Sequence, residues 1–465
     1  MSASARLGTC ALIIALVLDV LTAPVGAQDT RTVSEPGAPA PCSVLRAQLT
    51  PMADSTLAKA DERRLDTKRI QSAIDGCTPG HAVVLQADGG RRAFLAGPLE
   101  LRGGVTLVVG EGAILFGSRD PRLYDVAPGR CGVVDSRGHG CRALINADHA
   151  AGAGVMGPGT IDGRGRARLL GQDVSWWDLA QQAKVEKRYQ SSPRLLVLEH
   201  ANDFTLYRVR LRNAGNFHVF YERGNGFTAW GVVIDTRDPR ARNTDGIDPA
   251  SSSNVTITRS FINTGDDNVA IKAGSTGPST HISITHNHFY RGHGVSIGSE
   301  TNGGVSAIRV SDLSIDGADN GLRIKSNAAR GGLVHDVEYR DVCIQNTGHP
   351  IAMDTHYTAS AQTTGTLIPQ FRDIHLVDVR VLGGGRVILD GHDRAHPLGI
   401  SFDNVVFDAP RSVRLQATFV NAHVGPGPMN LPISGEDVRV SGAPGEAPAN
   451  ACTGKFVPMP TASAR

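Results

Sequence analysis

Three carboxylates stand close together in the middle of the chain, each in a short segment flanked by glycine. Asp245 lies in Asn-Thr-Asp-Gly, and Asp266 and Asp267 lie in Gly-Asp-Asp-Asn about twenty residues later. A histidine, His293, follows in Gly-His-Gly. Two carboxylates held close together raise the pKa of one member, so such a group can supply both a proton donor and a proton acceptor.

Two cations follow the histidine, Arg323 and Lys325, in the segment Arg-Ile-Lys. Residues two apart on a strand point the same way, so we expect both cations on one face. An arginine fork beside a lysine suits an anionic sugar. Each segment alone is a weak signal, and a second Gly-His-Gly around His139 has no predicted role. The order and spacing of the segments carry the interpretation.

These residues lie within a series of short strands that recur every 23 to 30 residues or so from about residue 202. Alternating apolar residues indicate strands, and a spacing of this size indicates a solenoid. The units are too short for a strand-helix-strand crossover. We therefore predict an all-β chain, a right-handed parallel β-helix with Asn and Gly at its corners. A β-sandwich or a propeller fits less well, because their strands or blades recur at other intervals. The strands are DFTLYRVRL, GFTAWGVVI, NVTITRSFI, HISITHNHF, AIRVSDLSI, DVEYRDVCI, DIHLVDVRV and ISFDNVVF.

A β-helix converts spacing along the chain into stacking, because successive coils lie about 4.8 Å apart. Four successive coils would then present the carboxylates, the histidine and the two cations along one face. Hydrolysis of a glycosidic bond needs such a set, in which one carboxylic acid protonates the leaving oxygen and a carboxylate activates water on the opposite side. Neighbouring residues of a regular strand face opposite ways, so we predict irregular backbone at Asp266 and Asp267, after Gly265.

The four segments resemble those of the pectin-depolymerising polygalacturonases, glycoside hydrolase family 28, in kind and in order. The resemblance extends from about residue 60 to 405 and implies hydrolysis of α-1,4-linked galacturonate with inversion. It implies that Asp266 is the general acid, that Asp245 and Asp267 position and deprotonate water, and that His293 supports the acid or the substrate.

The same resemblance implies that Arg323 and Lys325 bind the substrate carboxylate. A tyrosine after the last segment commonly lines the sugar site of relatives, and Tyr357 is the candidate here. The implied partner is polygalacturonate or pectin, with no cofactor and no metal. The net charge of +2 gives no reason to expect nucleic acid or a membrane as a partner.

Other functions remain open at this level. A pectate lyase shares the β-helix and would use the three carboxylates to hold Ca²⁺. A non-catalytic fibre would use the same face as a binding groove. Within the hydrolases, rhamnogalacturonan and xylogalacturonan are alternative substrates, and exo action is an alternative to the endo action that we favour.

The two ends of the chain suggest an exported protein. Residues 1–27 have an arginine, a short apolar run and a small-residue ending, and predict a signal peptide. We divide the rest into an N-terminal extension (28–55), a catalytic β-helix (56–440) and a tail (441–465). The segment 54–77 spaces Leu57, Ile70 and Ile74 among charged residues and predicts an amphipathic helix that covers the first coil.

Six cysteines remain after the signal peptide, and export favours disulfides. Fifteen pairings are possible. Proximity in the sequence favours Cys42 with Cys77 and Cys131 with Cys141, which leaves Cys343 for Cys452. No Cys-x-x-Cys pair suggests a metal site. A capped β-helix needs no partner chain, so we expect a secreted monomer.

Overall fold

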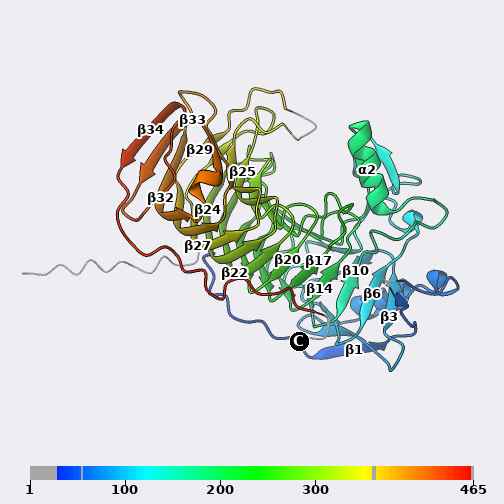
Figure 1. The fold of residues 1–465 in the computed structure, drawn as a ribbon. Helices are drawn as coiled ribbons and strands as arrows, with labels where there is room; N and C mark the ends of the chain where they lie inside the picture. Colours follow the sequence, from blue (N-terminus) through cyan, green and yellow to red (C-terminus); the bar gives the residue numbers. More distant parts are fainter. Residues whose placement is uncertain (1–28, 54–55, 359–362, 462–465) are drawn as a thin grey trace, which may run out of the picture.

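The computed structural model describes residues 29–53, 56–358 and 363–461. The chain winds into an elongated solenoid of short parallel strands with few helices (Figure 1). This confirms the predicted parallel β-helix. The strands form three stacks, in which each strand pairs in parallel with its counterpart one coil later. The predicted signal peptide lies outside the described residues, and in the part of the chain that is described no helix is long and apolar enough to cross a membrane.

The first stack begins at the N-terminal end and includes a strand from the segment 28–55. Its members are β1 (Pro41–Arg46), β2 (Ala82–Gln86), β5 (Thr106–Val109), β9 (Gly154–Met156), β13 (Phe204–Tyr207), β16 (Asn225–Trp230), β19 (Ser253–Thr258), the first parts of β22 (Ser279–Tyr290), β24 (Val305–Asp316), β27 (Val337–Gln345), β30 (Ile374–Leu382) and β32 (Leu398–Phe407), the last part of β33 (Val413–Val424), and β34 (Glu436–Gly442).

The second stack follows the first around a corner of each coil. Its members are β3 (Ala93–Ala96), β6 (Ile114–Gly117), β10 (Thr160–Asp162), β14 (Arg210–Arg212), β17 (Val233–Asp235), β20 (Phe261–Asn263), and the later parts of β22, β24, β27, β30 and β32.

The third stack carries the predicted site residues or the turns before them. Its members are β4 (Leu99–Glu100), β8 (Ile145–Asp148), β12 (Leu196–Glu199), β15 (Val219–Glu222), β18 (Ile247–Ala250), β21 (Val269–Ile271), β23 (Val295–Gly298), β25 (Asn320–Lys325), β28 (His349–Asp354), β31 (Gly385–Asp390) and the first part of β33.

The remaining elements are short. Two strands, β26 (Leu333–Val334) and β29 (Gln370–Phe371), extend the pairing of β24, and β7 (Val133–Asp135) pairs antiparallel with β11 (Tyr189–Ser191). The helices are α1 (Thr67–Asp75), α2 (Trp176–Glu186) and the 3₁₀ turns η2 (Asp61–Arg63), η3 (Pro121–Leu123) and η4 (Pro410–Ser412). Figure 1 shows α2 projecting from the solenoid.

The apolar segments that predicted single strands bend around a corner between the first and second stacks. One residue at this corner takes a positive φ, for example Arg208 between β13 and β14 and Arg259 between β19 and β20. We expected Asn and Gly at the corners, which is only partly correct. From β13 onward six of the eight positive-φ residues at this corner have charged or imidazole side chains. The eight are Arg208, Gly231, Arg259, His286, Asp312, Asp341, Asp378 and Asn404. A single residue in the left-handed region is tolerated without glycine where its side chain reaches solvent or a partner.

The core is a column of aliphatic side chains inside the coils. Along the third stack Ile247, Val269 and Val295 are paired in register and fully buried. The alternate residues of these strands therefore point outward. This alternation places Arg323 and Lys325 outside, with Ile324 in the core between them.

The first coil is covered by α1, which packs against β2 and β4. Ile70 and Ile74 on this helix are buried in the core, as predicted. The helix is shorter than the segment 54–77, and Leu57 lies outside it. Leu57 instead packs in a separate apolar cluster. Glu62 makes a buried ion pair with Arg164, which follows β10. These contacts pull the chain out of helical geometry before Thr67.

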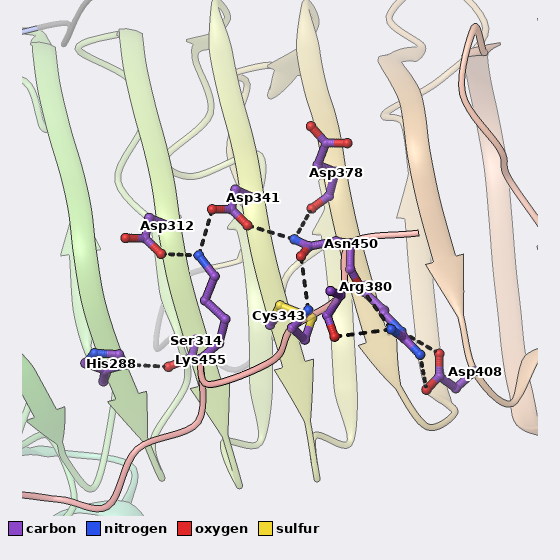
Figure 2. The surroundings of a disulfide bond; sticks show 12 residues. His288, Asp312, Ser314, Asp341, Cys343, Asp378, Arg380, Asp408, Asn450 and Lys455 are labelled. Atoms are coloured by element: carbon purple, nitrogen blue, oxygen red, sulfur yellow. Dashed lines mark hydrogen bonds and ion pairs between the residues drawn. A yellow bond between two sulfur atoms is a disulfide. The ribbon is translucent and has the colours of Figure 1, made fainter. Parts of the chain in front are cut away.

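All three predicted disulfides are present, at Cys42–Cys77, Cys131–Cys141 and Cys343–Cys452. The last of these fixes the C-terminal segment along the outside of the coils (Figure 2). There the amide nitrogen of Asn450 donates to Asp341 Oδ1 at 2.8 Å, and Lys455 lies between Asp341 and Asp312.

The N-terminal segment also follows the outside of the solenoid. Asp29 is buried, and its carboxylate accepts a hydrogen bond of 2.7 Å from Thr256 on β19. Tyr207 on β13 donates to Glu35 at 2.8 Å. The first described residues therefore cross the coils from β19 toward β13.

Candidate functional site

The predicted site residues gather at one edge of the third stack. Asp245, Asp267 and His293 each lie two residues before a residue that is paired in register with its counterpart in the next coil. The three residues therefore occupy equivalent turn positions, before β18, β21 and β23. Arg323 and Lys325 lie on β25 in the following coil, and their outward side chains reach the same turns. The structure thus brings together the predicted carboxylates, imidazole and cations.

The backbone at Asp266 and Asp267 is irregular, as predicted, because both residues lie in the turn between β20 and β21. Gly265 has no positive φ, but a Cβ there would overlap the carbonyl oxygen of Ala241. Both glycines of the Gly-His-Gly segment are needed for a similar reason. A Cβ at Gly292 or Gly294 would overlap a backbone oxygen of a neighbouring coil, and both have positive φ values of 94° and 60°.

Asn268 connects the carboxylate turn to the histidine turn. Its side-chain nitrogen donates to the carbonyl oxygen of Arg291 at 2.9 Å, and its side-chain oxygen accepts from the backbone nitrogen of Gly294 at 2.8 Å. The backbone nitrogen of His293 also donates to the carbonyl oxygen of Asp266 at 3.1 Å. This buried amide fixes the height of His293 relative to the acids.

His293 lies against both members of the Asp-Asp pair. Its Nδ1 is 3.1 Å from Asp266 Oδ1 and 3.5 Å from Asp267 Oδ1. Its Nε2 is 3.6 Å from the exposed carboxylate of Asp319. The Asp266 and His293 side chains are each 25% exposed, whereas Asp267 is 2% exposed. Asp266 and His293 therefore reach solvent, and Asp267 is enclosed behind them.

Asp267 is surrounded by donors. Lys325 Nζ lies 2.7 Å from its Oδ2, Ser296 Oγ donates to its Oδ1 at 2.7 Å, and a guanidinium nitrogen of Arg323 lies 3.5 Å from Oδ1. The Lys325 side chain is itself 8% exposed. The structure therefore uses Lys325 as a buried partner of a carboxylate, and Arg323 is the more available cation.

Tyr357 stands over the two cations. Its ring centroid is 5.3 Å from the Arg323 guanidinium carbon and 5.5 Å from Lys325 Nζ. The Tyr357 backbone is fixed by hydrogen bonds to Ser326 and from the Asn327 amide. The predicted tyrosine therefore joins the cationic end of the group.

Two further charged residues belong to this site, and sequence reasoning missed them. Lys272 Nζ is 3.6 Å from Asp245 Oδ2 and 3.3 Å from Asp248 Oδ2. Asp248 follows Ile247 on β18 and Lys272 follows β21, so both point outward on the same edge. The outward position in the period-two pattern of each coil was the signal that could have found them.

The three predicted carboxyls differ in their proton affinity. Burial, with the nearby Asp248 carboxylate, raises the pKa of Asp245 well above its usual range. Burial also acts to raise the pKa of Asp267, but Lys325, His293 and Arg323 outweigh it and hold that pKa well below the usual value. Burial also acts to raise the pKa of Asp266, but its hydrogen bond with His293 and the charges of His293 and Lys325 together outweigh burial and lower that pKa.

Among Asp266, Asp267 and His293, the imidazole of His293 holds the proton. Burial acts to lower the pKa of His293, but its contacts with Asp266 and Asp267 outweigh burial and raise that pKa to about 10. The free site therefore contains an imidazolium next to two carboxylates. Burial also raises the pKa of Asp248 to about 7.

Known proteins resemble this chain over most of its length. The model of the glycosyl hydrolases family 28 matches residues 108–424. An endo-polygalacturonase from Pectobacterium carotovorum subsp. carotovorum is 45% identical over 390 residues, which cover 84% of this chain and 92% of that protein. The chain belongs to glycosyl hydrolase family 28.

Two other similarities support this membership. A polygalacturonase from Ralstonia solanacearum is 38% identical, with 94% of each chain covered. The solved structure of a polygalacturonase from Erwinia carotovora ssp. carotovora superposes with a TM-score of 0.78 at 43% identity, covering 85% of this chain and 99% of that one. The family assignment makes the protein a glycoside hydrolase.

The group of Asp266, Asp267 and His293 also has the composition of a metal site, since one ligand atom from each lies within 4.8 Å of the others. Its chemistry does not suit a cation. A metal-binding histidine must be neutral, whereas the two carboxylates stabilise the protonated imidazole here. Lys325 and Arg323 already neutralise Asp267. The arrangement fits acid–base chemistry of the family 28 kind better than it fits Ca²⁺.

Proposed function

We propose that the protein is an inverting polygalacturonase that cuts α-1,4-galacturonosyl linkages within the polygalacturonate chain of pectin. The observation that carries this proposal is the enclosed acid group beside an outward arginine on one edge of the solenoid. The 45% identity to an endo-polygalacturonase over most of both chains supports the endo mode. An exo-acting enzyme and a hydrolase of rhamnogalacturonan or xylogalacturonan remain the alternatives.

Asp266 is the proposed general acid. It is 25% exposed and contacts His293, so it can reach a bound substrate. In the free site the pKa values place the proton on His293 rather than on Asp266. Moving this proton from His293 to Asp266 needs no proton from solvent. A bound polyanion excludes water and raises the pKa of nearby carboxyls, which favours that transfer. Asp266 then donates the proton to the leaving glycosidic oxygen.

Asp267 is the proposed main base toward water. Its pKa is depressed by Lys325 and Arg323, so it is ionised and ready to accept a proton. Asp245 has a raised pKa and a 6% exposed side chain, and we assign it the positioning of the attacking water. Judged by pKa alone Asp245 would be the acid, but Asp266 has the better access and the imidazole partner.

Arg323 is the proposed ligand of the substrate carboxylate at the cut, with Tyr357 beside it. Its side chain is 13% exposed, and its contact with Asp267 is long at 3.5 Å, so it retains donors for a substrate. Lys325 contributes mainly by keeping Asp267 ionised. An arginine that binds a sugar carboxylate at this position favours polygalacturonate over polymers with a neutral sugar there.

The first experiment is an assay of the purified mature protein on polygalacturonic acid with a chelator present. Reducing ends, ultraviolet absorbance and viscosity are followed together. We expect rising reducing ends, no ultraviolet-absorbing product, and an early fall in viscosity. Release of small products at constant viscosity would indicate exo action, and an ultraviolet-absorbing product or a requirement for calcium would overturn the hydrolase assignment.

We also propose that the enzyme is exported and monomeric. The three disulfides suit an oxidising compartment. N-terminal sequencing of protein from the culture medium should begin near residue 28, and light scattering should give the mass of one chain. An uncleaved N-terminus or a dimer mass would contradict these two points.

A further inference from the structure

Arg194 is a cation on the site face whose donors are not used. Its guanidinium carbon lies 4.2 Å from the ring centroid of Phe220 and 4.9 Å from that of Phe217. Within the described residues, no hydrogen bond or ion pair joins this guanidinium to another group. A guanidinium has five N–H donors, and stacking on aromatic rings satisfies none of them. The two rings hold the guanidinium in place and leave its donors for a ligand.

The position of Arg194 follows from the pairing of the third stack. Leu196 pairs with Val219, and Val219 pairs with Ile247. Arg194 lies two residues before Leu196, just as Asp245 lies two residues before Ile247. The two residues therefore occupy the same turn position, two coils apart, or roughly 10 Å along the solenoid.

Arg194 and Arg323 lie on opposite sides of the acids. Arg194 precedes them on the N-terminal side, and Arg323 follows on β25, five coil steps away. At about 4.8 Å per step their backbones lie roughly 24 Å apart. The Arg323 side chain reaches back to Asp267, three coil steps or roughly 14 Å from the turn of Arg194, so the two cations bind different sugar rings. Phe217 extends the upstream site toward the acids, because Lys272 Nζ lies 5.3 Å from its ring centroid.

Three carboxylates lie near Arg194. The carboxylates of Asp248, Glu222 and Asp245 attract it, yet none of them makes an ion pair with it. Burial, with the nearby charge of Arg194, lowers the pKa of His139, so the loop between Cys131 and Cys141 also lies near Arg194.

We infer that Arg194, held on Phe217 and Phe220, binds the carboxylate of a galacturonate unit upstream of the scissile bond. This inference rests on the proposed function and deepens it. A chain held by Arg194 on one side and Arg323 on the other has sugar rings on both sides of the cut. Binding of this kind selects internal bonds of a long polyanion.

The test compares Arg194→Gln and Arg194→Lys with the wild type on trigalacturonate, hexagalacturonate and polygalacturonate. Hydrogen bonds to charged groups are strong enough that we expect kcat/KM of Arg194→Gln on the polymer to fall about 10- to 100-fold, mainly through KM. The loss should shrink on trigalacturonate, which has fewer sugar rings to place on both sides of the cut. Arg194→Lys should lie between the two, because it keeps the charge but not the planar fork.

Arg259→Gln is the matched control. Arg259 also lies over an aromatic ring, Trp230 at 5.6 Å, but at the corner between the first and second stacks. It should not change kcat/KM on any substrate. No loss on the polymer, or an equal loss at all chain lengths in both Arg194 variants, would overturn the inference. A wild type that releases no reducing ends from polygalacturonate would instead overturn the proposed function.

Discussion

Two groups of stacked aspartates contact lysines in this solenoid, and they differ mainly in their access to water. In the site, Asp267 lies 2.7 Å from Lys325, with side chains 2% and 8% exposed. On another side of the coils, Asp341 lies 2.7 Å from Lys455, with side chains 40% and 25% exposed (Figure 2). In both places the repeat stacks carboxylates about one coil apart near a lysine. In the site the lysine comes from β25 of the same stack, and at the exposed group it comes from the C-terminal segment.

The difference in exposure shows how stacked aspartates can form an acid–base site in one place and hold the C-terminal segment in another. In water the Coulomb energy between stacked charges is small, so the exposed group can hold the C-terminal segment without a specialised environment. In the enclosed group the same charges interact strongly and separate the pKa values of Asp245, Asp267 and His293. Burial is therefore what makes the enclosed aspartates and histidine act as proton donors and acceptors, whereas the exposed aspartates only form ion pairs.

The largest expected effect comes from removing the acid. Asp266→Asn keeps the shape of the side chain but cannot donate the proton, and general acid catalysis contributes about 10²- to 10⁴-fold. We expect kcat on polygalacturonate to fall by that factor, with little change in the thermal midpoint. Steady-state kinetics and a thermal melt measure the two quantities.

Asp319→Asn is the control for that variant. Asp319 also faces His293, at 3.6 Å, but its side chain is 83% exposed. We expect less than a threefold change in kcat. Full activity in Asp266→Asn would mean that the three carboxylates only bind the substrate. Equal losses in the two variants would mean that the enclosed Asp266 and the exposed Asp319 do not differ in their role.

The next effect concerns stability. Lys325→Met leaves the Asp267 carboxylate buried with fewer partners, and breaking a buried ion pair in this way costs about 3–5 kcal/mol. Arg323 and Ser296 remain beside Asp267, so we expect a value near the lower end. Urea denaturation measures the change in the free energy of unfolding. A cost below about 1 kcal/mol would mean that the enclosed pair behaves like an exposed one.

The sequence predicted the features that repeat or that belong to a compact segment. Alternation within strands and the spacing between them predicted the β-helix, and short segments of unusual composition located Asp245, the Asp-Asp pair, His293 and the two cations. The side of the solenoid on which they meet follows from the same spacing. Proximity along the chain predicted the pairs Cys42–Cys77 and Cys131–Cys141, and Cys343–Cys452 followed by elimination.

Residues without a short segment of unusual composition were harder to find. The period-two pattern places Lys272 outward but does not show that it meets Asp245 and Asp248. The position of Arg194, two coils before Asp245, follows only from the strand register. The predicted length of the first helix was wrong because Leu57 and Glu62 make contacts with distant residues. Such contacts depend on the register of the whole solenoid and leave no periodic signal of their own.

A third effect concerns pH. The folded-state pKa of His293 is about 10 against an ordinary value of 6.5, so its stabilising contribution is complete below about pH 6.5 and is lost as pH rises through about 10. The depressed pKa of Asp267 acts in the opposite direction, and its contribution is lost as pH falls below the ordinary range of an aspartate.

His293→Gln isolates the histidine contribution. We expect the stability difference between wild type and variant to be largest near pH 5.5 and to shrink steadily toward pH 10. Urea titrations at several pH values measure it, and subtracting the variant curve removes the titration of groups that do not contact His293. A difference that does not change with pH would contradict the assigned protonation of His293.

The smallest effect is expected at the exposed group. Lys455→Met removes the lysine between Asp312 and Asp341, whose side chains are 36% and 40% exposed, and partly exposed ion pairs contribute about 0–1 kcal/mol. The Cys343–Cys452 disulfide and the hydrogen bonds of Asn450 still hold the segment. We expect a loss of at most about 1 kcal/mol in urea denaturation and no change in kcat. A loss as large as that of Lys325→Met would mean that stacking of carboxylates, rather than their enclosure, sets the strength of both groups.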